Sequence, residues 1–344
     1  MILKHEVAVI SIDITSFCNL RCPFCFNVSG ANGQDVPLKQ IVEAVRHLKT
    51  EDTTIILSGG EPMLYKELDS LLECLCAMGI SDISMISNAT IINDNVLSLL
   101  KQYNVKLQVS FNYDKTIMWD NCIPLYERQI EFIKKISKLD LPELSFRSMI
   151  YSRNKDAAED ILHIALEHGI NEVYFARIIN KGIARHNTDL MLSTQEEYAI
   201  YKSILRNKEE YKNQISVFVL GFDHGDCYLF KDSNDIGAWA ISLGFDGLVY
   251  GCRSLFGKQF ALGNYFEEDW SVILSEERLE RVRIELKKEL SPCIQCELYD
   301  RCIPPCPGTA DHENGQFNKF CDVRKLLQLT ESFLQKKNKE TCIL

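Results

Sequence analysis

The stretch SFCNLRCPFCFN, residues 16–27, places Cys18, Cys22 and Cys25 within eight residues, directly after an apolar run. Thiolates spaced C-x3-C-x2-C can bind three corners of a cubic iron–sulfur cluster. A zinc ion would normally need a fourth Cys or His nearby, and the next 20 residues contain neither. Three buried core thiols are the structural alternative. A cluster held by only three cysteines would leave one iron open to a substrate or cofactor.

The cysteine loop follows the first of six strand-like segments, and helix-like segments separate these strands. Six β-then-α units in order predict an α/β fold, a parallel sheet with helices outside it. A curved, TIM-like partial (β/α)6 barrel fits better than an eight-stranded one, because the pattern stops near residue 180. The expected strands are 7–14, 53–58, 82–87, 105–111, 144–150 and 172–178.

The second half of the chain has a different residue pattern. STQE at 193–196 predicts a helix start with its cap. A short apolar strand, ISVFVL, follows, and beyond Gly221 the chain is rich in Gly and Cys. One amphipathic helix is expected over 275–290 and a terminal one from about Val323. We expect a domain boundary at roughly 185–222.

Composition excludes several classes of function. The chain has 344 residues, 46% hydrophobic and 25% charged, with a net charge of −10 and no basic block, which argues against nucleic acid as a partner. No apolar run is long enough to cross a bilayer, and the charged N-terminus does not resemble a signal peptide. A cytoplasmic protein is the default. Its 14 cysteines are clustered, which in a reducing compartment favours metal or redox chemistry over disulfides.

Polar motifs follow the next strands and are expected at the same mouth of the barrel. In LSGGEP, Gly59 and Gly60 would let the backbone approach a ligand closely, and Glu61 presents a carboxylate. Two further motifs, SNAT and VSFN, are individually weak signals, because Ser and Asn after a strand are usually turn residues. They contribute Ser87, Asn88, Ser110 and Asn112.

Arg147 and Arg177 lie inside strand-like runs, where a guanidinium is unlikely to point into the apolar helix layer. We expect them inside the barrel, facing an anionic group of either a cofactor or a substrate.

The cysteine loop resembles the signature of the radical S-adenosylmethionine (radical SAM) superfamily, C-x3-C-x-φ-C, with Phe24 as the aromatic φ. The resemblance implies a [4Fe–4S] cluster whose open iron binds S-adenosylmethionine, and reductive cleavage to a 5′-deoxyadenosyl radical. It implies that the motif at Gly59–Glu61 binds the methionine ammonium. The Ser and Asn residues of SNAT and VSFN would contact the ribose or carboxylate of the cofactor, and Arg147 is a further cofactor candidate.

The C-terminal cysteines resemble the SPASM extension of radical SAM enzymes that modify peptides and proteins. The spacing CIQCELYDRCIPPC and the upstream GLVYGC carry this resemblance, which implies two auxiliary [4Fe–4S] clusters and three clusters in all. The implied ligands of the outer cluster are Cys293, Cys296, Cys302 and Cys321. The implied ligands of the inner cluster are Cys227, Cys252 and Cys306.

The inner cluster lacks a fourth cysteine. Asp226, Asp232 or another side chain could complete it, or its open iron could bind substrate, for example a peptide thiolate. A zinc ribbon would fit one C-x2-C pair but not the whole interlocked set. The implied domains are a radical SAM core (1–190), a bridging helix and strand (191–222), a SPASM domain (223–330) and a tail (331–344).

The resemblance favours hydrogen abstraction from a residue of a ribosomally made peptide, leading to a thioether or carbon–carbon crosslink, epimerisation or oxidation. Sulfatase-type maturases are disfavoured, because they carry an Asp where this chain has Arg253. Cys122 is a candidate hydrogen donor, with an ordinary loop thiol as the alternative. About six residues precede the first strand, so a leader peptide would need the barrel surface or a separate leader-binding protein.

Electrons would come from a flavodoxin or ferredoxin. Two other functions are a radical SAM enzyme for a small molecule, such as decarboxylation of a tetrapyrrole precursor, and a non-catalytic iron–sulfur electron carrier. A carrier needs no open iron, so the three-cysteine loop argues against it.

Overall fold

The computed structural model describes residues 6–27, 30–119, 123–139, 141–179, 181–219, 238–255 and 257–294. The six strands expected from the sequence are all present and pair in parallel, in chain order. This confirms a curved α/β sheet of the partial-barrel type. The strands are β1 (Glu6–Thr15), β2 (Thr54–Gly59), β3 (Ile83–Ser87), β4 (Lys106–Ser110), β7 (Leu144–Ile150) and β8 (Glu172–Arg177).

Four more strands extend this sheet at its two ends. β9 (Ser216–Val219) pairs in parallel with β8, and β10 (Ala238–Leu243) pairs in parallel with β1. β11 (Leu248–Tyr250) and β12 (Ala261–Asn264) continue antiparallel from β10. The sheet order is β12-β11-β10-β1-β2-β3-β4-β7-β8-β9. The sheet therefore continues across the expected boundary at 185–222, and the division into domains stays a prediction.

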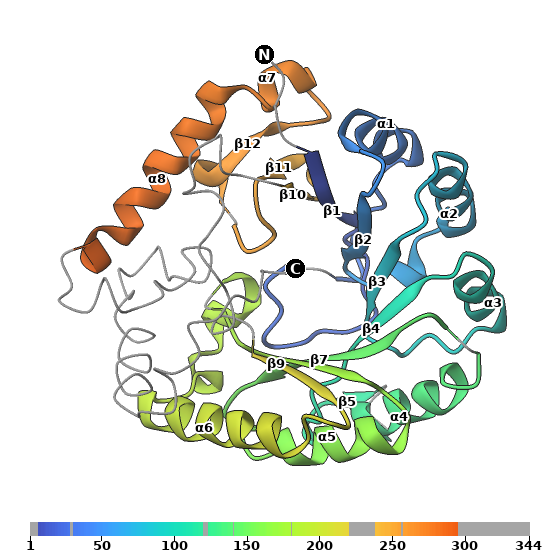
Figure 1. Ribbon diagram of the computed structural model, residues 1–344, viewed down its shortest axis with the longest axis vertical. Coiled ribbons are helices and arrows are strands. Elements are labelled where there is room, and N and C mark those ends of the chain that lie inside the picture. Colours follow the sequence, from blue (N-terminus) through green and yellow to red (C-terminus); the bar gives the residue numbers. More distant parts are fainter. Residues whose placement is uncertain are drawn as a thin grey trace.

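The helices form a ring outside the sheet, as Figure 1 shows. Helices separate the six strands as predicted, α8 covers the amphipathic helix expected over 275–290, and α6 begins with the expected capping box, in which Ser193 and Glu196 bond each other's backbone N–H. The terminal helix expected from about Val323 lies outside the described residues. A small hairpin of β5 (Met118–Trp119) and β6 (Ile123–Pro124) was not expected. The helices are α1 (Leu38–Leu48), α2 (Leu68–Ala77), α3 (Asp94–Gln102), α4 (Leu125–Ile136), α5 (Ala158–Glu167), α6 (Thr194–Glu210), α7 (Trp270–Ile273) and α8 (Glu276–Ile294).

Short 3-10 turns complete the loops between these elements. They are η1 (Pro62–Leu64), η2 (Gly182–His186), η3 (Thr188–Leu190) and η5 (Lys258–Phe260).

Side chains alternate between the two faces of the sheet, and this alternation creates an apolar outer face and a polar inner face. On β1, Ile10, Ile12 and Ile14 are fully buried in the core that the strands share with the helices. The alternate positions, including Ser11 and Asp13, lie on the opposite face. We call this opposite side of the curved sheet, away from the helices, the inner face.

Among the described residues, no helix combines the length and the apolar character needed to span a lipid bilayer.

The capping box of α6 gives a first prediction. Ser193→Ala removes the side-chain acceptor for the Glu196 N–H, so the free energy of unfolding should fall by about 1 kcal/mol. Ser98→Ala is the matched control, because Ser98 is exposed inside α3 and alanine is a better helix former there. Urea unfolding measures both changes. Equal effects of the two variants would contradict a stabilising cap.

Candidate functional site

The loop after β1 is held in place by backbone hydrogen bonds to itself and to a distant turn. Cys18 N–H donates to Gly30 O (3.1 Å), and Gly30 N–H donates to Ser16 O (3.0 Å). At the far side of the loop, Ile183 N–H from η2 donates to Cys25 O (2.8 Å). The loop that carries the three cysteines is thus anchored at both ends.

The glycine motif after β2 packs directly against this loop. Gly60 N–H donates to Thr15 O and Glu61 N–H donates to Phe17 O, both at 2.7 Å. A Cβ atom on Gly60 would lie 1.9 Å from Phe17 O, and Gly59 has a φ of +123°, which favours glycine. Within the described residues, the close approach that these glycines permit is to the backbone beside Cys18.

The Glu61 carboxylate is fully buried and bonded to the protein. Oε1 accepts from Met63 N–H (3.1 Å) and from the Ser87 hydroxyl (2.8 Å), and Oε2 accepts from Asn88 N–H (2.7 Å). Burial raises the pKa of Glu61 to about 7, although these three donors oppose the shift. The side chain therefore ties the glycine motif to the end of β3, and a direct contact of Glu61 or Ser87 with a cofactor stays a prediction.

The three thiols of the loop are free and half-buried. Cys18 Sγ accepts from Leu20 N–H (3.4 Å) and from the Asn88 side-chain amide (3.8 Å). Burial raises the pKa of Cys18 to about 11, and burial with repulsion from the other two thiolates raises the pKa of Cys22 further. As thiolates, these groups need a positive partner, which the irons of a cluster provide.

The three thiols of the loop are the donors that a cubic cluster needs. In the described part of the chain, no three His, Cys, Asp or Glu side chains converge closely enough to hold one metal ion. In a cubic cluster each thiolate binds a different iron, so its ligands stand farther apart than those of zinc. With its three thiols and with two N–H groups directed at the sulfur of Cys18, the loop fits a [4Fe–4S] cluster.

The aromatic residue of the signature also has a structural partner. Phe24 packs on Tyr151 with ring centroids 5.0 Å apart, and the buried Tyr151 hydroxyl donates to Asp114 at 2.6 Å. The residue between Cys22 and Cys25 is thereby attached to the loops that follow β4 and β7.

Of the other predicted cofactor residues, Asn112 has its side chain hydrogen-bonded within the protein, whereas Ser110 and Arg147 are neighbours on adjacent strands. Asn112 Oδ1 accepts from Met149 N–H at 2.7 Å. Ser110 and Arg147 are register partners on β4 and β7, on the inner face. Arg177, the last residue of β8, lies by alternation with Val173 and Phe175 on the outer side.

The inner face also carries charged residues whose position there the sequence interpretation did not predict. Arg253, which follows β11, donates from Nη2 to the Ser58 hydroxyl of β2 (2.5 Å), and Ser58 is the register partner of Asp13. Asp13 accepts from the Asn27 amide (3.1 Å), and burial raises its pKa while Arg253 opposes the shift. Asp13 lies between Ile12 and Ile14 on β1, and both isoleucines face the core. This alternation in the sequence could have predicted that Asp13 faces inward.

Arg147 lies on the same face of the sheet, on β7. Its Nη1 reaches Gln108 Oε1 at 3.4 Å, and burial together with repulsion from Arg253 lowers its pKa to about 10. Among the described residues no carboxylate forms an ion pair with Arg147. We call Asp13, Ser58, Arg147 and Arg253 the inner-face cluster.

Most of the predicted auxiliary ligands lie outside the described residues. Cys252 is described: it is half-buried, and its Sγ accepts from Ser254 N–H at 3.5 Å. Cys293 lies in α8, where its backbone is described but its side chain is not. The predicted residues outside the described ranges are Cys122, Cys227, Cys296, Cys302, Cys306 and Cys321, with Asp226 and Asp232.

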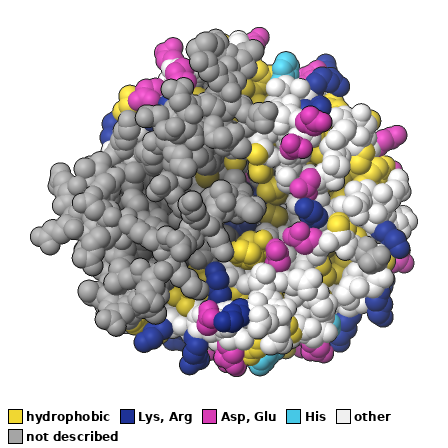
Figure 2. All heavy atoms as spheres, viewed as in Figure 1, with side chains coloured by type: hydrophobic (Ala, Val, Ile, Leu, Met, Phe, Trp, Pro, Cys, Tyr) yellow, Lys and Arg dark blue, Asp and Glu magenta, His cyan; other side chains and the backbone are white. Residues whose placement is uncertain are grey.

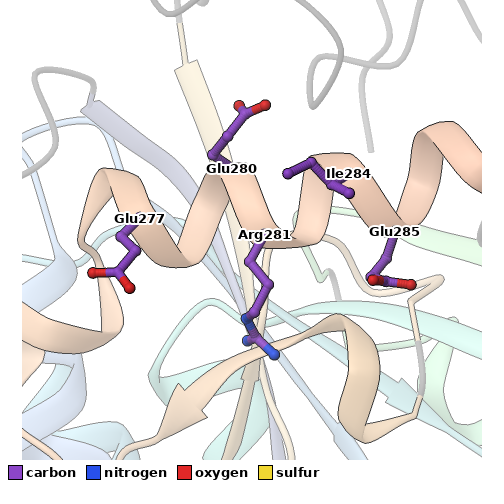
Figure 3. Close-up of a pocket in the computed structure, with 5 residues that line it drawn as sticks. All are labelled: Glu277, Glu280, Arg281, Ile284 and Glu285. Carbon is purple, nitrogen blue, oxygen red and sulfur yellow. The ribbon is translucent and has the colours of Figure 1, made fainter.

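A surface hollow on α8 is not part of this site. Five α8 side chains line it, Glu277, Glu280, Arg281, Ile284 and Glu285 (Figure 3). Arg281 is directed at the Ala261 carbonyl and donates to it. On the coloured part of the face in Figure 2, acidic and basic side chains are interspersed.

Comparison with known proteins relates the first half of the chain to one superfamily. Residues 12–165 match the model of the Radical SAM superfamily. A curated relative, a probable GTP 3′,8-cyclase of Saccharolobus islandicus, is 25% identical over 213 residues, which is 60% of this chain and 65% of the relative. The match thus spans slightly less than two thirds of that protein.

Solved structures share the fold over most of the chain. Native anSMEcpe with bound AdoMet has a TM-score of 0.70 and 17% identity, covering 93% of this chain and 95% of that one. Streptococcus suis SuiB bound to the precursor peptide SuiA has a TM-score of 0.66 and 16% identity, covering 88% and 72%. At these identities the likeness establishes the fold.

The contact between the two loops predicts that Gly60→Ala strongly destabilises the fold. Its Cβ would collide with the Phe17 carbonyl, so unfolding should become easier by about 1–3 kcal/mol. Gly30→Ala in the same loop is the control, because the nearest atom to its Cβ is 3.5 Å away on the Arg21 side chain. Thermal unfolding compares the two. A Gly60 variant as stable as the Gly30 variant would refute the close packing.

The Glu61 hydrogen bonds predict that Glu61→Gln is destabilising although it keeps the shape. An amide NH2 would face at least one of the three donors, which costs about 1–3 kcal/mol. Glu43→Gln on α1 is the control, since Glu43 is half-exposed in a 3.8 Å surface pair with Lys39. Urea unfolding at pH 8 measures both. The role assigned to Glu61 is wrong if both variants match the wild type.

Proposed function

We propose that this chain, which is a radical SAM enzyme, reductively cleaves S-adenosylmethionine and abstracts a hydrogen atom from a residue of a ribosomally made peptide. The superfamily implies one [4Fe–4S] cluster and S-adenosylmethionine. The cluster, when bound, supplies the electron that breaks the sulfonium C–S bond. The modification that follows is a thioether or carbon–carbon crosslink, an epimerisation or an oxidation.

The observation that carries this proposal is the contact between the cysteine loop and the glycine motif. Backbone hydrogen bonds of 2.7 Å join Gly60 and Glu61 to Thr15 and Phe17, immediately before Cys18. A cluster on the loop would then lie beside backbone groups of the motif, where an amino acid moiety could be held. A simple electron carrier has no need for this second element.

The protein's own residues would orient and protect the reactants. Cys18, Cys22 and Cys25 would hold the cluster, and the Leu20 N–H and Asn88 amide would donate to the sulfur of Cys18. Asn88 is itself fixed, because its N–H binds buried Glu61. The site therefore has little freedom to reorganise, which favours a defined reaction geometry.

A peptide substrate is supported by the shared fold. Both compared structures, anSMEcpe and SuiB, resemble this chain over most of its length, and SuiB is bound to the precursor peptide SuiA. The spacing of Cys293, Cys296, Cys302 and Cys306 adds the predicted pair of auxiliary clusters. We further propose a flavodoxin or ferredoxin as electron donor and a separate protein or the barrel surface for a leader peptide.

A small-molecule substrate is the second candidate. The curated relatives with the GTP 3′,8-cyclase name favour it, because they match 60% of this chain. Stimulation of cofactor cleavage by GTP, but not by a peptide encoded beside the gene, would replace the peptide proposal with this one.

The test is anaerobic reconstitution of the full chain, followed by dithionite and S-adenosylmethionine. The wild type should form 5′-deoxyadenosine, and the triple variant Cys18→Ala, Cys22→Ala, Cys25→Ala should form none. With three clusters the chain would carry on the order of 12 irons, so the triple variant should lose about one third of the iron. Cys74→Ala and Cys76→Ala on α2 are controls and should change neither readout.

Zinc in place of iron in the wild type, or no 5′-deoxyadenosine under any reducing condition, would overturn the proposed activity.

A further inference from the structure

The turn at residues 22–25 carries two of the three thiols that fit the cluster. It is closed by a hydrogen bond from Cys25 N–H to Cys22 O at 3.1 Å, and both of these groups belong to the turn itself. The contacts that attach the turn to the rest of the molecule include several from a distant segment, residues 182–190. This segment follows β8 and contains η2 and η3. We call it the brace.

The brace donates hydrogen bonds to two carbonyl groups of the turn. The side-chain amide of Asn187 donates from Nδ2 to Pro23 O at 3.0 Å, and Ile183 N–H donates to Cys25 O at 2.8 Å. A second bond from the same amide, to Ile183 O at 3.1 Å, holds the Asn187 side chain in place. Because both acceptors of this NH2 group are carbonyl oxygens, the position needs a hydrogen-bond donor.

Close packing joins the brace to the same part of the cysteine loop. Gly182 has a φ of +57°, and a Cβ atom there would lie 2.3 Å from Phe26 O, so the two backbones touch. Ala184 of the brace and Tyr151 belong to one small buried core, and the Phe24 ring packs against it. The aromatic residue between the two thiols is therefore held by the same unit as the carbonyl groups beside it.

The far end of the brace is attached to the loop that follows β7. Ser152 N–H donates to Leu190 O at 3.1 Å, and the Ser152 hydroxyl donates to Asp189 O at 2.8 Å. β7 and β8 are neighbours in the sheet, whereas the cysteine loop follows β1, which β2, β3 and β4 separate from β7. The brace thus connects the turn to strands that do not adjoin β1.

The third thiol of the loop has a separate set of supports. Cys18 N–H donates to Gly30 O, and the sulfur of Cys18 accepts from Leu20 N–H and from the Asn88 amide. The position of the turn relative to Cys18 therefore depends on contacts from two different parts of the barrel. Groups that orient metal ligands from behind commonly decide how firmly the metal is held.

We propose that Asn187 is a positioning residue for the iron–sulfur cluster. Through the Pro23 carbonyl it fixes the turn, so that Cys22 and Cys25 stand at the spacing that a cluster shared with Cys18 requires. The inference rests on the cluster of the proposed function and is independent of the substrate. A brace that only stabilised the fold would leave the properties of the bound cluster unchanged.

The test compares the release of iron with the stability of the fold. The full chain is reconstituted anaerobically with iron and sulfide, and a ferrous chelator, bathophenanthroline disulfonate, then records the rate of iron release. The triple variant Cys18→Ala, Cys22→Ala, Cys25→Ala supplies the contribution of any auxiliary clusters, which is subtracted. Electron paramagnetic resonance (EPR) spectra of the dithionite-reduced protein, with and without S-adenosylmethionine, are the second readout.

Two substitutions of Asn187 remove its donor in different ways. Asn187→Asp keeps the shape but places an oxygen opposite the Pro23 carbonyl, and Asn187→Ala removes the group without adding a charge. Each should release the iron of this cluster about tenfold faster than the wild type and change its EPR spectrum. Asn213→Asp, in an exposed turn after α6, is the control and should match the wild type. Thermal unfolding of the iron-free proteins verifies that each variant is folded.

Unchanged iron release and unchanged EPR spectra in both folded Asn187 variants would overturn the inference. It would also be overturned if Asn187→Ala, added to the triple variant, accelerated iron release there by the same factor, because the effect would then belong to the whole fold. A wild type that binds no more iron than the triple variant would overturn the proposed function, and this inference with it.

Discussion

The site depends on the direct backbone contact between the cysteine loop and the glycine motif. Thr15 and Phe17 on one side and Gly60 and Glu61 on the other are joined by two hydrogen bonds of 2.7 Å, with no space for a side chain between them. Because β1 and β2 are paired up to this point, the position of Cys18 is determined by the sheet itself. The cysteine loop is thereby attached to a rigid sheet, which is the usual requirement for a precise site.

The buried Glu61 carboxylate joins the glycine motif to the end of β3. Taking a carboxylate out of water is unfavourable, and the donors from Met63, Ser87 and Asn88 offset this by directing N–H and O–H groups at both oxygens. Asn88 then extends the network to the sulfur of Cys18. Loops that follow three consecutive strands are thus coupled through one side chain.

Local patterns in the sequence were sufficient for the parts of the fold that depend on neighbouring residues. The six parallel strands, the helices between them and the cap at Ser193 follow from periodicity and turn chemistry. The pairing of β10 with β1 did not, because a short strand far along the chain carries no mark of its partner. The motif around Glu61 indicated the residue type but not the direction of its side chain. Arg253 and Ser58 were missed as a pair because they meet across 195 residues of sequence.

The sheet order has a consequence for how the protein is made. β1 is made long before β10, its neighbour on one side, because β10 begins only at residue 238. Until then β1 is an unprotected edge with unpaired N–H and C=O groups, next to a loop of free thiols. The open edge of β1 and the free thiols beside it are therefore exposed together until β10 has been made.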